Sequence, residues 1–220
     1  LIPTTHEIIE QTTRILVTAI FEFASTAFVE FNTFDNSDQW KLVRNFYPFF
    51  SVLDSEYRMM TLMPDEQTMS FASYTTYYDV HTIVQFLPAT MSESNRAEAV
   101  RLVSNLLNVD IRKMRAKMRR WRPSENEFIA VLGVSFWSLD SASVSADVLE
   151  IASKYRRLIF GELNELYSAE MRLDEYASRL GEALMLLASI QSFFAEELSR
   201  FGVLKLLDVM GDDTMVARLN

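Results

Sequence analysis

Few residues of this chain have side chains suited to acid–base, nucleophilic or metal chemistry. Among its 220 residues there is no cysteine, and the two histidines are His6 and His81. The sequence therefore excludes a disulfide framework, a thiolate zinc site, a cysteine nucleophile and a three-histidine metal centre. Asp79 and His81 stand near a predicted hairpin, and we interpret them as surface residues because no nucleophile or ligand set accompanies either histidine, although distant carboxylates can converge in a fold. The five glycines lie too far apart for a dinucleotide fingerprint or a phosphate-binding loop.

The basic residues are distributed unevenly. Seven of the 21 lie within residues 112–122, which contain no acidic residue, and the remaining 14 stand against 30 acidic residues, a balance of −16. Such a surface repels a phosphate backbone, so we expect little contact with nucleic acid. The apolar members of this segment share one helix face, which predicts that its arginines and lysines lie in water; a nuclear-import or partner-docking patch is the alternative. Those apolar members are Ile111, Met114, Met118 and Trp121.

Helices are expected to position these residues, because glycine and proline are scarce. Together they account for ten of 220 residues, less than half of the usual share of about 12%, which argues against turn-rich β folds. Apolar spacings of three and four predict a long helix over 8–31, and Asp35 and Asn36 cap a second one with a kink or a break at Pro48. The serine-, threonine- and tyrosine-rich segment 61–80 predicts the only β element, a hairpin. Further helices are predicted at 95–107, 111–121, 125–138, 146–168 and 174–209, before a last short segment at 213–219.

One stretch, between Phe23 and Met60, carries a family pattern. The pattern consists of Phe31, then Asp38 and Gln39, then Leu42, Val43 and Arg44. It resembles the signature of nuclear receptor ligand-binding domains, in particular the hepatocyte nuclear factor four type and its expanded nematode relatives. The signature has a physical reason: Asp38 favours a helix amino end, Gln39 can bond backbone groups where two helices meet, and Phe31 can plug the gap below. The resemblance implies one domain over 1–220, an all-α, three-layer antiparallel helical sandwich with one short β-hairpin.

The resemblance also implies a cavity for a lipophilic ligand. It places Arg58 where this branch of the family binds the carboxylate of a fatty or retinoic acid, and a guanidinium in an apolar cavity needs such an anion. Alternatively, Arg58 lies on the helix surface and pairs with Asp54 one turn earlier. The other lining candidates, for which core packing is the competing interpretation, are Phe21, Ala24, Phe28, Leu53, Tyr57, Phe71 and Leu204. The 16 phenylalanines could equally fill the cavity and leave a receptor without a ligand.

A coregulator groove is implied as well, and the chain departs from the family at both of its charged ends. Thr26 stands where the family has a lysine, and Arg218 replaces a glutamate of the last helix, whose other groove positions are Met215, Val216 and Leu219. A guanidinium cannot accept hydrogen bonds from the backbone donors of a bound peptide. We therefore expect weak or altered coregulator recruitment, with Arg44 retained as the second basic residue of the groove.

The helix from Asp174 to Phe201 corresponds to the dimerisation helix of the family. Its candidate residues for a symmetric apolar seam are Leu184, Leu187, Ile190 and Phe194. The competing interpretation is that these side chains face the core of their own domain. Either a homodimer or a heterodimer with another receptor is expected.

These residues favour the ligand-binding and dimerisation domain of a nuclear-receptor transcription factor located in the nucleus. DNA contact is expected only through an upstream domain, and zinc only there, so that no cofactor belongs to 1–220. No uncharged run approaches the roughly 20 residues of a membrane span. The alternative is a soluble helical carrier of acidic lipids without a transcriptional role, and we do not expect an enzyme.

Overall fold

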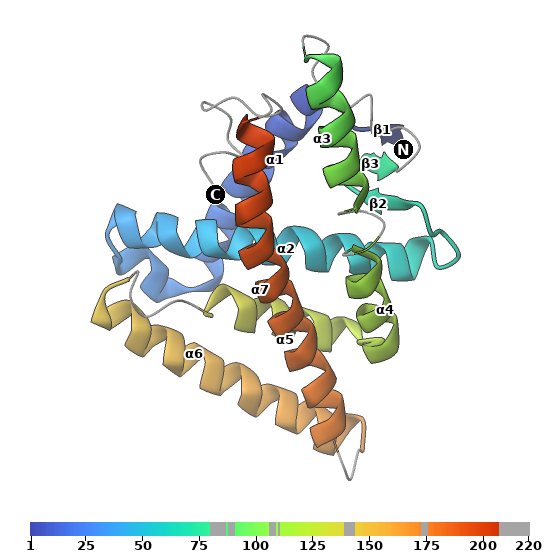
Figure 1. Ribbon diagram of the computed structural model, residues 1–220. Coiled ribbons are helices and arrows are strands. Elements are labelled where there is room, and N and C mark those ends of the chain that lie inside the picture. Colours follow the sequence, from blue (N-terminus) through green and yellow to red (C-terminus); the bar gives the residue numbers. More distant parts are fainter. Residues whose placement is uncertain are drawn as a thin grey trace.

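The chain forms a mostly helical domain with a small sheet (Figure 1). The computed structural model describes residues 1–79, 87, 91–105, 109, 111–138, 144–172 and 176–206, with the backbone alone at 6 and 195–206. In chain order the elements are β1 (Ile2–Pro3), α1 (His6–Ala27), a 3-10 turn (Val29–Thr33), α2 (Asn36–Leu62), β2 (Met69–Phe71), β3 (Thr76–Asp79), α3 (Glu93–Asn105), α4 (Arg112–Trp121), α5 (Glu125–Phe136), α6 (Ala146–Glu165), a π turn (Leu166–Glu170) and α7 (Ala177–Leu206). The predicted all-α class with a short hairpin is confirmed.

Local side-chain bonds begin the helices where the sequence predicts. The Asp35 carboxylate accepts from the Asp38 backbone N–H at 2.7 Å at the start of α2. At the start of α5, Ser124 and Glu127 accept from one another's backbone N–H groups, which completes a capping box. Two differences from the prediction concern the first helices: α1 ends at Ala27 before the 3-10 turn, and α2 continues through Pro48 without a break, which leaves the predicted kink as the alternative.

The sheet has one strand more than the sequence indicated. β2 and β3 form the predicted antiparallel hairpin, with Met69 opposite Asp79. β1 then pairs in parallel with β3, and Thr4 N–H extends this contact by donating to the Tyr77 carbonyl at 2.9 Å. A strand of two residues is too short to show a period in its sequence, which is why β1 was not predicted.

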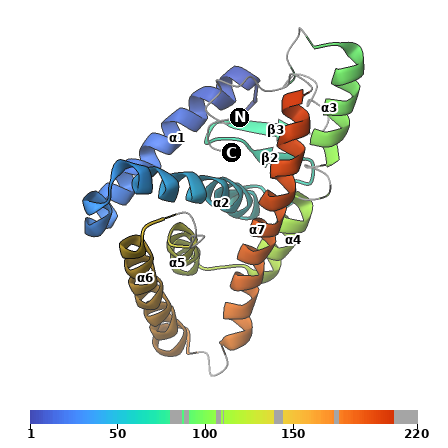
Figure 2. The same cartoon turned by 60° about the vertical axis from the view of Figure 1, so that its left-hand side comes forward.

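The helices form three layers, which Figure 2 shows in side view: α1 lies on one side of α2, and α4 and α7 lie on the other. The middle layer contains α2, α5 and α6, and its two faces carry separate core clusters. Phe31, Leu42 and Trp137 are 0% exposed in the cluster shared by α1, α2 and α6. None of the helices in the described ranges combines the length and apolar character that crossing a membrane requires.

Candidate functional site

A cavity of about 440 Å³ lies between α1, α2, the hairpin and α3. Its volume falls within the range of about 300–1,000 Å³ that is typical of small-molecule sites. The apolar part of its lining includes Ile9, Leu16, Val52, Phe71 and Ile111, and the polar part includes Thr13, Tyr47, Asp54, Ser55, Glu56, Arg58 and Ser70. The described residues thus surround an apolar space with a few polar groups, as expected for a site that holds a lipophilic molecule.

Arg58 lies in the cavity wall and forms the pair with Asp54 that the alternative interpretation predicted. It lines the cavity, and its guanidinium also pairs with Asp54, with Nη2 at 2.7 Å and Nε at 2.9 Å from Asp54 Oδ2. A third bond runs from Arg58 Nη1 to the Ser73 carbonyl at 3.1 Å. The guanidinium carbon lies 4.3 Å from the Phe71 ring centre and 4.8 Å from that of Tyr74, both within cation–π range.

The hairpin turn places the groups that hold Arg58. Ser73 Oγ accepts from the backbone N–H of Thr76 at 3.2 Å and bonds Thr76 Oγ1 at 2.7 Å, a serine turn that brings Ser73 and Tyr74 over the end of α2. The Asp54 side chain is largely buried in the cavity wall, and this burial raises the pKa of its carboxyl while the Arg58 charge opposes the rise.

Two other polar side chains of the cavity bond each other, and a third is buried without a partner among the described residues. Thr13 Oγ1 and Tyr47 OH lie 3.1 Å apart in hydrogen-bond contact, and burial raises the pKa of Tyr47. Ser55 is 7% exposed, and within the described residues its buried hydroxyl has no hydrogen-bond partner. Sequence reasoning missed Ser55, although its position three residues before Arg58 on α2 puts both on one helix face.

The predicted lining residues divide between the cavity and the core. Phe71 lines the cavity, and Phe28 lines a second, neighbouring cavity of about 960 Å³ between α1, α5 and α6. Four other predicted lining residues pack in the core instead. They are Ala24 and Leu53, both 0% exposed, Phe21, whose ring lies 5.2 Å from that of Phe31, and Tyr57, which stacks on Phe128 at 4.0 Å. The side chain of Leu204 lies outside the described residues.

Helix α1 shows the same division along its length. Ile9 and Leu16 line the cavity, whereas Ala24 is buried in the core. Periodicity identifies the buried faces of a helix but does not say whether protein or a cavity lies opposite.

The family-signature residues form hydrogen bonds and pack at the junction between the 3-10 turn and α2. Gln39 Nε2 donates to the Phe31 carbonyl at 2.9 Å, and Phe31 is fully buried beneath this bond. Asp38 accepts from Lys41 Nζ at 2.9 Å and from the Ser145 backbone N–H at 3.3 Å, and these bonds lower the pKa of its carboxyl in spite of its burial. The physical roles predicted for Phe31, Asp38 and Gln39 match these contacts.

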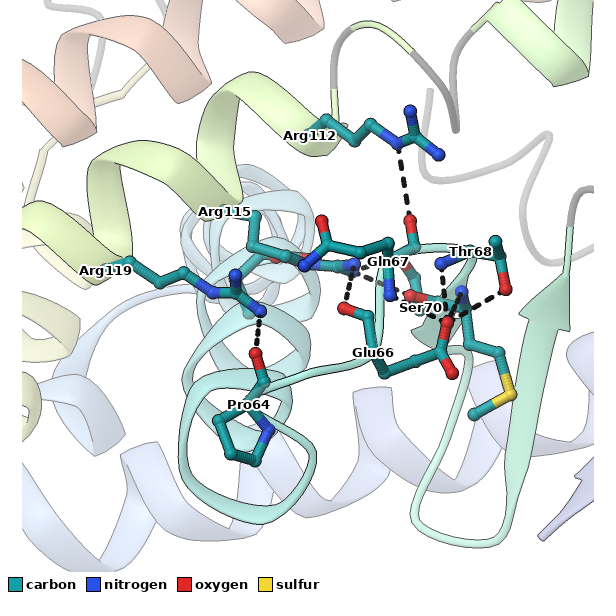
Figure 3. A network of polar contacts seen from close by, with 10 residues as sticks. Pro64, Glu66, Gln67, Thr68, Ser70, Arg112, Arg115 and Arg119 are labelled. Carbon is teal, nitrogen blue, oxygen red and sulfur yellow. Dashed lines mark hydrogen bonds and ion pairs between the residues drawn. The ribbon is translucent and has the colours of Figure 1, made fainter.

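The basic segment 112–122 is more than a solvated helix face, as Figure 3 shows. Arg112 Nε donates to the Gln67 carbonyl at 3.3 Å, and Arg119 donates to the Pro64 carbonyl. Arg115 is 3% exposed, so the prediction that the arginines lie in water is wrong for this residue. Its position explains why: Arg115 stands four residues after Ile111 and three before Met118, on the apolar face itself.

Arg115 joins the cavity wall to α4. Its Nε and Nη2 lie 2.8 and 3.2 Å from the two carboxylate oxygens of Glu56, and Nη2 also donates to the Met69 carbonyl and to Ser70 Oγ, each at 2.8 Å. Burial raises the pKa of Glu56, and the Arg115 charge opposes the rise. Because Glu56 and Ser70 both line the cavity, this buried ion pair ties α2 and the hairpin to one helix.

The predicted partner surfaces are described only in part. Thr26 and Arg44 are exposed, as a coregulator groove requires, whereas Met215, Val216, Arg218 and Leu219 lie outside the described residues. On α7, Ile190 is 0% exposed and faces the core of its own domain, which corrects its assignment to a dimer seam. Leu187 and Phe194 pack partly against the same cluster. Leu184 is 43% exposed and remains available to a partner.

Comparisons with known proteins agree on one family. A family profile described as the ligand-binding domain of nuclear hormone receptor matches residues 3–207. The chain is 27% identical over 199 residues to nuclear hormone receptor family member nhr-43 of Caenorhabditis elegans, covering 87% of the chain and 44% of that protein. It is 22% identical over 187 residues to the high zinc activated nuclear receptor protein of the same organism, covering 78% of the chain and 42% of that protein. The chain thus spans less than half the length of these curated relatives.

The fold has solved counterparts as well. The ultraspiracle ligand-binding domain from Drosophila melanogaster matches with a TM-score of 0.67 at 15% identity, covering 95% of this chain and 76% of that one. At this identity the likeness concerns the fold alone, and it supports the three-layer arrangement described above.

Proposed function

Because the chain belongs to the family of nuclear hormone receptor ligand-binding domains, we propose that it binds a lipophilic small molecule in the cavity beside Arg58 and regulates transcription as part of a longer receptor. The observation that carries the proposal is the cavity of about 440 Å³, whose lining is mainly apolar and includes Arg58, Asp54 and Ser55. A largely apolar cavity of this size favours a ligand that buries much of its surface.

Retention of a ligand by the purified domain tests the proposal. Ala19 lines the cavity, so Ala19→Phe should fill part of it and reduce the amount of small molecule that native mass spectrometry and solvent extraction recover. Ala116→Phe is the matched control, because Ala116 is likewise an exposed helical alanine but lies on α4. Equal recovery from the wild type and Ala19→Phe would place the ligand elsewhere and contradict the proposal.

We further propose that α7 supplies a dimer contact through Leu184, with Leu187 and Phe194 at its edge. An exposed leucine beside a partly buried apolar pair is the kind of surface that a second subunit covers. Leu184→Asp should shift the domain toward monomer in sedimentation velocity, whereas Leu158→Asp, an exposed leucine of α6, should not. A dimer that persists unchanged in Leu184→Asp would exclude this surface.

Coregulator recruitment is proposed to be weak or altered, because Thr26 and Arg218 replace the two charged residues that the family uses. Binding of an LxxLL peptide should be weak in the wild type and should strengthen in Arg218→Glu, measured by fluorescence anisotropy. Tight binding that does not depend on residue 218 would refute this point.

The location in the nucleus and the contact with DNA are proposed for the longer receptor, which would hold zinc in an upstream DNA-binding domain. A soluble carrier of lipids is the alternative function, and no enzymatic activity is proposed. The full reading frame discriminates between receptor and carrier, because only a receptor requires a cysteine-rich zinc module.

A further inference from the structure

Ser124 stands in the short connection between α4 and α5, directly after the basic segment. This connection consists of residues 122–124, which are not helical. Ser124 is exposed, as are Arg120 and Arg122 before it and Glu125 after it. The serine hydroxyl is therefore within reach of an enzyme that approaches the domain from outside.

Three arginines precede this serine, at two, four and five positions before it. They are Arg122, Arg120 and Arg119. Residues 112–122 contain seven basic and no acidic residues, whereas the rest of the chain has 14 basic against 30 acidic residues, a balance of −16. The side chain of Arg120 is 76% exposed, so its pair with Glu182 contributes little and can be exchanged for another partner. Protein kinases select substrates by charge pattern, and this pattern fits a kinase whose substrate groove is acidic.

Ser145 shows that the arginines, and not the start of a helix, distinguish Ser124. Ser145 is likewise exposed and precedes a helix, α6, with φ −65° and ψ 158°, where Ser124 has φ −66° and ψ 165°. The hydroxyl of Ser145 caps no backbone N–H of its helix, and residues 140–144 contain no arginine or lysine. The two serines therefore match in backbone and exposure and differ in the charge that precedes them.

A phosphate on Ser124 would lie beside a buried ion pair that joins α5 to α7. The Ser124 N–H donates to Glu127 Oε2 at 2.7 Å, and Ser124 Oγ accepts from the Glu127 N–H at 3.3 Å. Glu127 is 0% exposed, and it accepts from Arg179 Nη2 at 2.7 Å. Arg179 also donates to the Arg122 carbonyl at 3.2 Å, so its guanidinium lies at the same junction.

The phosphate would act on both partners of this pair. It carries a charge of about −1.5 to −2 and three acceptor oxygens. Its charge repels the Glu127 carboxylate, which is buried, and its oxygens compete for the Arg179 guanidinium, whose side chain is 28% exposed. Both effects weaken the pair and leave a buried carboxylate with less compensation.

We propose that Ser124 is a phosphorylation site for an arginine-directed protein kinase, and that its phosphate loosens the contact between α5 and α7. In the reaction, Ser124 Oγ attacks the γ-phosphorus of ATP. The Oγ–P bond forms as the bond between this phosphorus and ADP breaks, and the hydroxyl proton passes to a base of the kinase. The proposal gives the basic segment a role and does not depend on a ligand in the cavity.

Phosphate incorporation into the folded domain tests the site. The probes are two arginine-directed enzymes, cyclic-AMP-dependent protein kinase and protein kinase C, with casein kinase two as the acid-directed comparison. Tandem mass spectrometry locates the phosphate. With at least one arginine-directed kinase, Ser124 should be phosphorylated at least about tenfold faster than Ser145 and at least about tenfold faster than by casein kinase two.

Variants of exposed arginines show whether the charge pattern is responsible. Arg120→Gln/Arg122→Gln should slow phosphorylation of Ser124 by at least about tenfold. Arg101→Gln is the matched control, because the side chain of Arg101 is 61% exposed on α3, away from the serine in sequence, and it should leave the rate unchanged. The comparison of Ser124 with Ser145 uses the wild type and so needs no variant to fold.

Thermal melting of the phosphorylated domain tests the consequence. Phosphate on Ser124 should lower the melting temperature by about 3–10 °C. Glu127→Gln removes the carboxylate that the phosphate repels, so in this variant phosphorylation should shift the melting temperature by less than about half as much. Kinase treatment of Ser124→Ala should leave the melting temperature unchanged.

The outcomes are distinct. Phosphorylation of Ser124 that depends on Arg120 and Arg122 supports the site. Absence of phosphate on Ser124 after both arginine-directed kinases, equal rates at Ser124 and Ser145, or a faster reaction with casein kinase two overturns it. A phosphorylated domain that melts at the temperature of the unmodified one overturns the proposed loosening.

Discussion

Replacing Arg115 with methionine should destabilise the domain severely. The side chains of Arg115 and Glu56 are 4% and 2% exposed, and their ion pair spans 2.8 Å between Nε and Oε2. Methionine retains much of the length of arginine but neither its charge nor its donors. Removing one partner of a buried pair costs about 3–5 kcal/mol, because the other partner is left buried and uncompensated. That cost corresponds to a roughly 160- to 4,600-fold larger unfolding constant.

The pH dependence of this cost follows from Glu56. Burial already raises the pKa of Glu56 above its ordinary value of 4.5 in the folded protein, although Arg115 opposes the rise. A raised folded-state pKa contributes stability that is present below the unfolded-state value and is lost as the pH rises through the folded-state value. Without Arg115 the pKa rises further, so the difference between the wild type and Arg115→Met should be largest at neutral pH and should shrink in acid.

Urea unfolding followed by circular dichroism measures the free energy of unfolding at pH 7 and pH 5. The matched control is Arg101→Met, because Arg101 and Glu98 form an exposed ion pair whose side chains are 61% and 40% exposed. Such pairs contribute about 0.2–1 kcal/mol. The double variant Glu56→Leu/Arg115→Met should recover much of the lost stability, since an apolar pair carries no buried charge. A loss below about 1 kcal/mol for Arg115→Met would refute the reasoning.

Two further predictions concern other buried polar contacts. Gln39→Leu leaves the Phe31 carbonyl without its 2.9 Å donor, and it should lower the free energy of unfolding by about 1–3 kcal/mol; a melting temperature equal to that of the wild type would contradict this. Glu127 is fully buried, and although burial opposes it, the bonds from Arg179 and Ser124 lower its pKa below 4.5. The stability from this pair is therefore present above that value and is lost as the pH falls through the folded-state pKa. In Glu127→Gln, the free energy of unfolding should consequently decrease less steeply in acid than in the wild type. An equally steep decrease in acid would argue against the pair.

Much of the fold could be predicted because its signals are local. The caps at Asp35 and Ser124 act over three residues, and apolar spacing identifies the helices from neighbouring residues alone. The family signature extends this reach, because Phe31 and Gln39 lie eight residues apart and meet directly. Short segments whose stability depends on a distant partner, such as β1 on β3, escaped prediction.

The candidate site was predictable only in its position. Sequence alone determined that Arg58 belongs to the helix beside the hairpin and that Asp54 stands one turn earlier. Tertiary structure decided that the Ser73 carbonyl, 15 residues away, completes the enclosure of Arg58, and that Arg115 reaches Glu56 across 59 residues. Periodicity shows which side of a helix is buried, but the charge that a cavity presents depends on which side chains the fold brings to face one another. For this protein, that pairing makes Arg58 one partner of an ion pair in the wall of the cavity.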